Sequence, residues 1–310
     1  MLVNTLDSFS IIPTGKALCA EIRGVDFAEP VPYDVRDAIM EAWAEHLVLL
    51  FRGMSLDDDQ LLRATEYFGG QQEAGSRGYF MRAGFKPGET KSVSVQPGIS
   101  VVTNVDDDGK LQNSAKAFGN LPLKWHSDNS YVEVPPTGSL LHALVVPIDG
   151  GGETSFNNQY LAYETLSAEM KTAIEGKHIR HDGHRSTTGT LRPTMELPQT
   201  RDDITGPVHP IVRINPLTGK RALYLGRHYE FPSSHIVELN DEDSEALLAP
   251  LWAHATQDHL MWTHDGWTAG DLLLWDNRCT MHARTPIDHT QPRVMHRALI
   301  KGDPVISPWG

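Results

Sequence analysis

Short runs of apolar residues, each ended by a turn signal, make up much of the chain. Runs of this length, bounded by Gly, Pro, Asn or Asp, predict β-strands. The segment 215–220, Asn-Pro-Leu-Thr-Gly-Lys, separates two of them and predicts a hairpin loop. Many short strands joined by turns favour a barrel or a two-sheet jelly roll over a doubly wound α/β fold. The runs lie at 47–51, 139–146, 211–214, 222–225, 271–275, 280–283 and 294–300.

Four other stretches have the residue pattern of helices. The first repeats Val35, Ile39 and Trp43 every four residues, which places the three side chains on one helix face. The other three are expected to follow small polar residues that cap helix N-termini. The chain is therefore predicted to be mainly β with flanking helices. The three capping residues are Ser55, Ser167 and Asn240.

No repeat, low-complexity segment or Pro/Ser-rich linker divides the chain, so we expect one domain that spans residues 1–310. Two segments rich in Gly and polar residues, 75–98 and 181–207, are longer than ordinary connections in a compact domain. Loops of this length are usually functional lids or disordered segments. We expect both segments to be mobile lid loops.

The charge balance limits the partners that the protein can have. The chain carries 27 Lys and Arg against 40 Asp and Glu, a formal net charge of −13, which argues against nucleic acid as a partner. No stretch approaches the roughly 18 apolar residues that span a bilayer, and the N-terminus does not resemble a signal peptide. Cys19 and Cys279 are too few for a disulfide framework. We expect a cytoplasmic protein without a membrane partner, and a homo-oligomer, either a dimer or a tetramer.

The tetrapeptide 125–128, Trp-His-Ser-Asp, contains the strongest candidate for a metal site. On an extended strand, His126 and Asp128 project to the same face. His282, on a later predicted strand, would complete a 2-His-1-carboxylate triad, which leaves three metal positions open. A rival pair with the same spacing, His228 and Glu230, is not followed by a comparable set of anion-binding residues.

Two arginines lie in the apolar stretch 293–300. Arg293 and Arg297 are four residues apart, so both side chains project to one face of an extended strand. A buried guanidinium is costly unless it meets an anion, and Arg binds carboxylates through two parallel hydrogen bonds. We therefore expect both arginines to bind anions. The alternative is a structural network of salt bridges with nearby acidic side chains.

Taken together, these motifs resemble the taurine dioxygenase and 2,4-dichlorophenoxyacetate dioxygenase (TauD/TfdA) family. The resemblance covers nearly the whole chain, except that residues 73–123 do not match the taurine enzyme, so specificity for taurine is not implied. It implies a double-stranded β-helix (jelly-roll) core in which His126, Asp128 and His282 bind Fe(II). The matching segments are 24–26, 50–53, 125–131, 135–138, 151–154, 209–210, 275–278 and 292–297, together with His282.

The resemblance also implies roles for other residues. Arg293 would bind the distal carboxylate of 2-oxoglutarate, and Thr154 would donate a hydrogen bond to it. Arg297 would hold the acidic group of the substrate, with Arg227 and His228 nearby. The implied reaction uses Fe(II), O₂ and 2-oxoglutarate to hydroxylate a small organic anion, a sulfonate, sulfate ester or carboxylate, with release of succinate and CO₂. Hydroxylation beside a heteroatom would then cleave the product.

Two other functions fit part of the same pattern. A zinc-dependent hydrolase would use the same three ligands but would leave the two arginines without a role. A non-catalytic jelly-roll protein would bind the anion without converting it. A halogenase is disfavoured, because Asp128 fills the position that such enzymes leave open for chloride.

Overall fold

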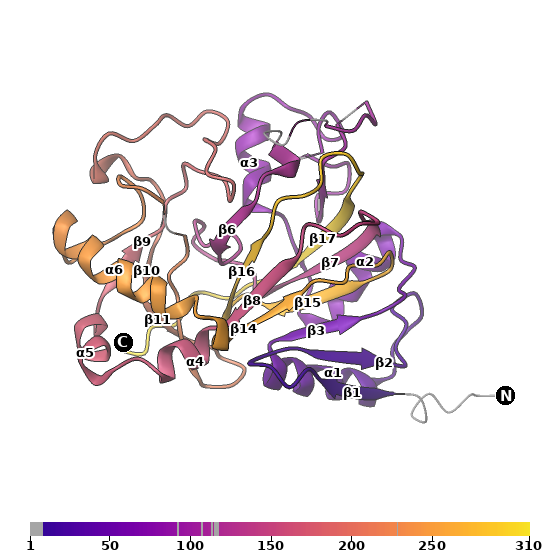
Figure 1. Ribbon diagram of the computed structural model, residues 1–310, viewed down its shortest axis with the longest axis horizontal. Helices are drawn as coiled ribbons and strands as arrows, with labels where there is room; N and C mark the ends of the chain where they lie inside the picture. Colours follow the sequence, from indigo (N-terminus) through magenta and orange to yellow (C-terminus); the bar gives the residue numbers. More distant parts are fainter. Residues whose placement is uncertain (1–8, 92, 107, 113, 115–117, 228) are drawn as a thin grey trace.

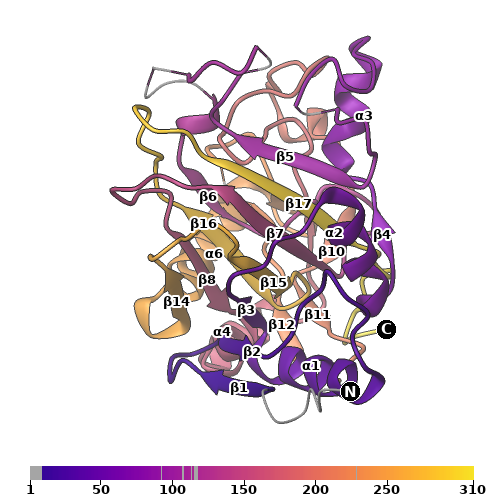
Figure 2. The ribbon, with the colours of Figure 1, turned by 90° about the vertical axis from the view of Figure 1, so that its right-hand side faces the viewer.

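The computed structural model describes residues 9–310 except 92, 107, 113, 115–117 and 228. In this part of the chain, two β-sheets face each other, and helices α1 (Tyr33–His46) and α2 (Asp58–Thr65) lie on the outer face of the larger sheet (Figures 1 and 2). The structure is therefore mainly β with flanking helices, as predicted. No helix in the described ranges is long and apolar enough to cross a lipid bilayer.

The larger sheet has the strand order β1-β2-β3-β15-β7-β17-β4, with β5 also paired to β17. Neighbouring strands are antiparallel, except for β2 and β3, which are parallel. Every residue of β15 is buried, which explains why this strand appears in the sequence as an unbroken apolar run. The strands are β1 (Ser10–Pro13), β2 (Ala20–Arg23), β3 (Val48–Phe51), β4 (Gln71–Gln72), β5 (Ile99–Thr103), β7 (Gly138–Val145), β15 (Leu272–Asp276) and β17 (Val294–Ile300).

The facing sheet has the order β14-β8-β16-β6. Its strands are β6 (Leu123–His126), β8 (Thr154–Asn158), β14 (Met261–His264) and β16 (Thr280–Arg284). The strands β11 (Val212–Ile214) and β12 (Arg221–Leu223) form an antiparallel hairpin, which confirms the turn predicted at 215–220. A further small sheet joins β9 (His178–Arg180), β10 (Val208–Pro210) and β13 (His235–Ile236).

The core between the two sheets supports one wall of the candidate site. Leu273, Trp275 and Met295 of the larger sheet belong to the same buried cluster as Phe156 of the facing sheet. The ring of His282 lies 5.6 Å from that of Phe156 and 5.0 Å from that of Trp275. Burial of each large apolar side chain contributes about 1.5–3 kcal/mol, so this histidine is held by well-packed neighbours.

Three of the four predicted helices are confirmed, two of them with the predicted N-cap. Val35, Ile39 and Trp43 are buried on one face of α1. Ser167 caps α5 (Ala168–Ile174), and Asn240 caps α6 (Asp241–Ala255), each by accepting a hydrogen bond from a backbone amide.

The predicted start of the second helix at Ser55 is wrong. The N-cap of α2 is Asp57, whose side chain accepts a hydrogen bond from the amide of Gln60, while the Gln60 side chain accepts one from the amide of Asp57. This reciprocal pair satisfies two amides that the helix itself leaves without partners.

Two short helices were not predicted from the sequence. Helix α4 (Gln159–Glu164) begins at an Asn158 cap, and α3 (Gly75–Arg82) lies inside the segment 75–98 that was expected to be a loop. Two glycines weaken the helical signal of α3. Its Arg77 is buried and donates to the Ser94 carbonyl, so tertiary contacts stabilise it.

The second predicted lid, 181–207, has a buried base. Residues His181, Asp182 and His184 are at most 6% exposed, and His184 Nδ1 lies 2.9 Å from the Glu196 carbonyl. Residues 185–189 are half-buried, Thr190 is exposed, and Leu191 is 42% exposed. A lid role stays a prediction, and it applies to 185–191 rather than to the whole segment.

The two candidate caps give a matched test of the second helix. Asp57→Ala is expected to lower the free energy of unfolding by about 1 kcal/mol, because it leaves the Gln60 amide without its acceptor. Ser55→Ala is the control and should leave stability unchanged. Urea unfolding followed by circular dichroism measures both; equal losses in the two variants would contradict the capping assignment.

Candidate metal centre and substrate pocket

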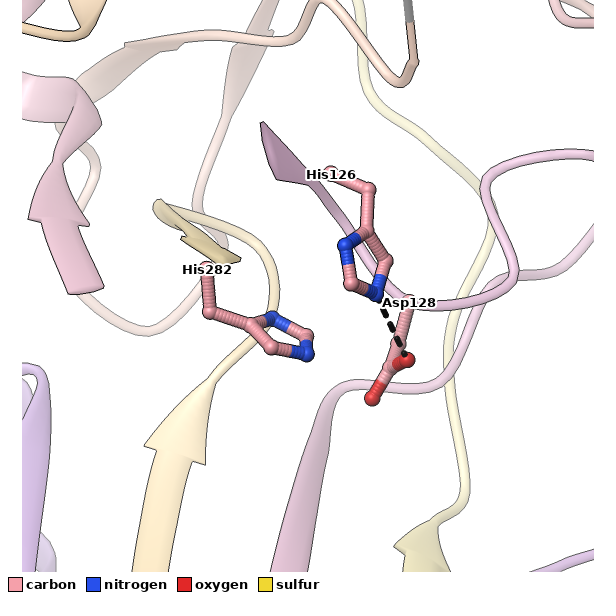
Figure 3. Close-up of side chains that lie close together, drawn as sticks. All are labelled: His126, Asp128 and His282. Carbon is pink, nitrogen blue, oxygen red and sulfur yellow. Dashed lines mark ion pairs between the residues drawn. The ribbon is translucent and has the colours of Figure 1, made fainter. Parts of the chain in front are cut away.

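Three potential metal ligands from two distant segments of the chain converge between the two sheets. His126 ends β6, Asp128 follows two residues later, and His282 lies directly opposite His126 in the pairing of β16 with β6. One ligand atom from each of the three lies within 4.8 Å of the others, and the two imidazole centroids are 4.1 Å apart. Figure 3 shows the three side chains pointing toward one common point. The structure therefore brings together the three residues that the sequence singled out.

Hydrogen bonding sets the tautomer of His126. Its Nδ1 lies 2.7 Å from the carbonyl oxygen of Lys124, which can only accept, so Nδ1 carries the proton. Nε2 is then left with a free lone pair and lies 3.7 Å from Asp128 Oδ1. Burial lowers the pKa of His126 and lowers that of His282 well below its usual value, so both rings are neutral near pH 7. Neutral imidazole is the form that binds metals.

The carboxylate of Asp128 is held on both oxygens. Arg297 Nη1 donates to Oδ1 at 2.9 Å, and Ser139 Oγ donates to Oδ2 at 2.9 Å. Burial raises the pKa of Asp128, but Arg297 and His126 outweigh that effect and bring the pKa well below its usual range. The carboxylate is therefore ionised as a ligand should be.

The backbone of Asp128 is also held in place. Asn277 Oδ1 accepts from the Asp128 amide at 2.6 Å, and Asn277 Nδ2 donates to the Asp128 carbonyl at 2.9 Å. Asp128 lies beyond the end of β6 and has no strand partner there, so the Asn277 side chain binds its backbone groups instead. Partners behind the ligands are known to orient them and to tune metal affinity.

Two neutral imidazoles and one carboxylate form the facial ligand set of non-haem Fe(II) sites. His282 Nδ1 is buried and has no hydrogen-bond partner among the described residues, while both oxygens of Asp128 are held. The donors and their charges therefore fit Fe(II). Zinc accepts the same ligand types, so the ligand set alone does not exclude the hydrolase alternative.

The three ligands border a cavity of about 390 Å³, a size typical of sites for small molecules. One part of its wall is apolar, with Phe80, Val102 and Leu191. Another part carries the buried arginines Arg192 and Arg227. The cavity thus combines an apolar surface with positive charge beside the candidate metal centre.

Arg293 is 1% exposed, and all three of its guanidinium nitrogens lack a hydrogen-bond partner in the described part of the chain. Its guanidinium carbon lies 5.7 Å from the centre of the Trp267 ring. Burial, followed by the neighbouring Arg284, brings the pKa of Arg293 well below its usual value. An anion from outside the chain would satisfy this group.

Arg284 was not predicted from the sequence as a site residue. Its neighbour across the sheet is Thr154, and burial lowers its pKa to about 10. Arg284 borders the cavity, and its Nη2 donates to the carbonyls of Gly119 and Leu121. The alternation of side chains along β16 could have found it, because Arg284 lies two residues after His282 and so faces the same side.

The predicted substrate residues have different surroundings. Arg297 borders the cavity, but its described ion pair is with Asp128. The alternative left open by the sequence, a salt bridge with a nearby acidic side chain, therefore applies to part of this guanidinium. Arg227 is 4% exposed and also borders the cavity. His228 lies outside the described residues, and its companion in the rival pair, Glu230, is exposed. Arg192 was not predicted from the sequence as a site residue.

Comparison with known proteins places the chain among dioxygenases. The family model "Taurine catabolism dioxygenase TauD, TfdA family" matches residues 10–299. The chain is 31% identical over 306 residues to an (S)-phenoxypropionate/alpha-ketoglutarate-dioxygenase of Sphingobium herbicidovorans, covering 96% of each protein. It is 29% identical to an alpha-ketoglutarate-dependent 2,4-dichlorophenoxyacetate dioxygenase of Cupriavidus pinatubonensis, over 95% of this chain and 98% of that protein.

A solved structure agrees with this comparison. The crystal structure of AAD-2 in complex with Mn(II) and N-oxalylglycine matches with a TM-score of 0.77 and 27% identity, covering 96% of this chain and 99% of that one. The likeness confirms the predicted jelly-roll fold.

The metal centre can be tested by removing its ligands one at a time. His126→Ala, Asp128→Ala and His282→Ala are each expected to weaken Fe(II) binding at least tenfold, because each removes one of three protein ligands. Anaerobic equilibrium dialysis measures the affinity, with Glu230→Gln as the control that should bind like the parent. Full affinity in any of the three alanine variants, or a loss in the control, would rule out the assignment.

Proposed function

The chain belongs to the TauD/TfdA family of dioxygenases, and we propose that His126, Asp128 and His282 hold the Fe(II) of this enzyme. The protein is an Fe(II)- and 2-oxoglutarate-dependent oxidoreductase that hydroxylates a small organic anion. When bound, the iron with O₂ supplies the oxidising power for C–H hydroxylation, while 2-oxoglutarate is converted to succinate and CO₂. The observation that carries the residue assignment is the convergence of three buried ligands beside buried arginines.

The chain's own residues prepare this site before any ligand arrives. Lys124 keeps the proton of His126 on Nδ1, so that Nε2 faces the metal position. Arg297 and Ser139 hold both oxygens of Asp128, and Asn277 fixes its backbone. Such preorganisation spares the protein the cost of ordering these groups during the reaction.

The distal carboxylate of 2-oxoglutarate is assigned to Arg293, with Thr154 as a hydrogen-bond donor. Leaving a buried guanidinium without an anion is strongly unfavourable, and Arg293 has three unpartnered nitrogens within the described structure. Arg284, which borders the cavity and lies opposite Thr154 in the sheet, adds a second positive charge. A dicarboxylate with one end at the metal and the other at Arg293 would neutralise part of this charge.

We assign the substrate to the carboxylates that carry an apolar or aromatic body. Relatives named for phenoxypropionate and 2,4-dichlorophenoxyacetate support this class, as does the apolar wall formed by Phe80, Val102 and Leu191. Arg297 and Arg227 border the same cavity and are proposed to contact the substrate. The proposed role of His228 rests on the family resemblance alone.

The location and the assembly of the enzyme are separate proposals. A cytoplasmic location agrees with two buried free cysteines, since reducing compartments keep thiols unpaired. We also propose a homo-oligomer, either a dimer or a tetramer, and light scattering of the purified protein measures its mass.

Arg293→Ala tests the cosubstrate assignment. The variant should raise the KM for 2-oxoglutarate at least tenfold, because losing one partner of a buried charge pair costs about 2–5 kcal/mol. The KM for the prime substrate should change far less. Arg293→Lys keeps the positive charge but loses the planar guanidinium group, so its KM for 2-oxoglutarate should lie between those of the parent and of Arg293→Ala. An Arg293→Ala enzyme with unchanged dependence on 2-oxoglutarate would place the anchor elsewhere.

An oxygen electrode tests the reaction itself. With Fe(II), 2-oxoglutarate and 2-phenoxypropionate, the enzyme should consume O₂ and form succinate, and the Zn(II)-loaded enzyme should do neither. A panel that also contains sulfonates and sulfate esters tests the substrate class. Hydrolysis by the zinc form without O₂ uptake would support the hydrolase instead, and tight anion binding without any turnover would support a binding protein.

A further inference from the structure

Two buried arginines, Arg192 and Arg227, meet beside one aromatic ring in the wall of the cavity. The guanidinium carbon of Arg192 lies 4.0 Å from the centre of the Tyr131 ring, and that of Arg227 lies 4.9 Å from it. Both side chains are at least nine-tenths buried, with exposures of 7% and 4%. The two arginines share the cavity with Asp128 and His282.

Neither arginine is neutralised by the part of the protein that the structure describes. Their Nε atoms are buried and lack hydrogen-bond partners there. The Nη1 of Arg227 donates to a backbone carbonyl, that of Arg185, at 3.0 Å. The acid nearest in sequence to Arg192, Glu196, is exposed. Asp182 is already bound by Arg185 at 3.1 Å and by Ser233 at 2.9 Å.

Two like charges that share one ring repel each other. Burial lowers the pKa of Arg192, and the neighbouring Arg227 lowers it further. The face of an aromatic ring attracts a cation, but it does not supply the full negative charge that two guanidinium groups need. A carboxylate from a ligand would accept hydrogen bonds from both arginines and remove the repulsion.

Arg297 is less suited to be the main substrate arginine. Its Nη1 already donates to Asp128 Oδ1 at 2.9 Å, and that bond holds a proposed metal ligand in position. A substrate anion drawn to Arg297 would compete with this ligand for the same guanidinium. Arg192 and Arg227 form no such ion pair with a carboxylate of the described residues.

We propose that Arg192 and Arg227, arranged around Tyr131, form the clamp that binds the carboxylate of the substrate, an inference that rests on the dioxygenase function proposed above. The apolar body of the substrate lies against Phe80, Val102 and Leu191, which border the same cavity. The ligand class is therefore a monocarboxylate with an apolar body, such as an aryloxyalkanoate.

The clamp also links substrate binding to the predicted lid. Arg185 and Leu191 pair across a short antiparallel bridge, and the Arg192 amide donates to the His184 carbonyl at 2.8 Å. These bonds form a hairpin with its turn at 186–190, and Arg192 reaches from the end of the hairpin into the cavity. A carboxylate bound by Arg192 and Arg227 thus ties this hairpin to the chain beside β6, where Arg227 pairs with His126.

The test compares 2-phenoxypropionate with its neutral amide, in the Fe(II)-loaded enzyme with 2-oxoglutarate. The parent enzyme should prefer the carboxylate, and Arg192→Gln and Arg227→Gln should each reduce the carboxylate-to-amide ratio of kcat/KM at least tenfold. The slow turnover of 2-oxoglutarate without substrate should persist. Arg201→Gln is the matched control, because Arg201 lies in the same segment 181–207 but pairs with Asp241 at the surface.

A second measurement uses the parent enzyme and does not depend on a variant folding. Hydrogen exchange of the amides at 186–190 should slow when 2-phenoxypropionate binds and should change much less with the amide. If the two arginines had a purely structural role, the variants would lose kcat/KM equally for the carboxylate and the amide. The carboxylate-to-amide ratio would then stay unchanged. Any one of three results overturns the clamp: an unchanged ratio in the variants, equal slowing of hydrogen exchange by the carboxylate and the amide, or no binding of 2-phenoxypropionate to the parent enzyme.

Failure of the clamp and failure of the proposed function give different results. If the function is wrong, the parent enzyme does not form succinate with any member of the panel. If only the clamp is wrong, the parent turns over 2-oxoglutarate normally while Arg192→Gln keeps its preference for the carboxylate.

Discussion

The antiparallel pairing of β16 with β6 is the constraint on which the site depends. It sets His282 opposite His126, two residues that are far apart in the sequence, and brings their rings within 4.1 Å. Asp128 lies beyond the end of the paired strand, so its position depends on Asn277, which binds both its amide and its carbonyl. A shift of one residue in this register would turn His282 away from the cavity. The packing of Phe156 and Trp275 against His282 ties the register to the core.

Buried positive charge is the second organising feature of the cavity. The chain as a whole is acidic, with a formal charge of −13, yet Arg192, Arg227, Arg284 and Arg293 are all buried at or near the site. Each of these four side chains has at least one buried nitrogen without a partner in the described residues. Folding therefore leaves a charge that two anions can neutralise. The proposals assign Arg293 to the cosubstrate and Arg192 and Arg227 to the carboxylate of the substrate. Arg297 borders the same cavity and also pairs with Asp128.

Much of this site could be predicted from the sequence because its signals are local. The spacing of His126 and Asp128 on an extended strand and the apolar runs of β15 and β17 need no knowledge of tertiary structure. Arg284 could have been found by the same alternation. Arg192 could not, because it lies in an irregular segment with no period, and its contact with Tyr131 arises from long-range folding. Helix α3 was missed because its glycines oppose a helix that tertiary contacts stabilise.

The most direct test of this account is a crystal structure of the enzyme with Fe(II) and 2-oxoglutarate, grown without oxygen. We expect one metal ion bound by His126, Asp128 and His282, and the distal carboxylate of 2-oxoglutarate in contact with Arg293. Metal at any other residues, or an Arg293 that pairs with a carboxylate of the protein while 2-oxoglutarate binds elsewhere, would contradict it.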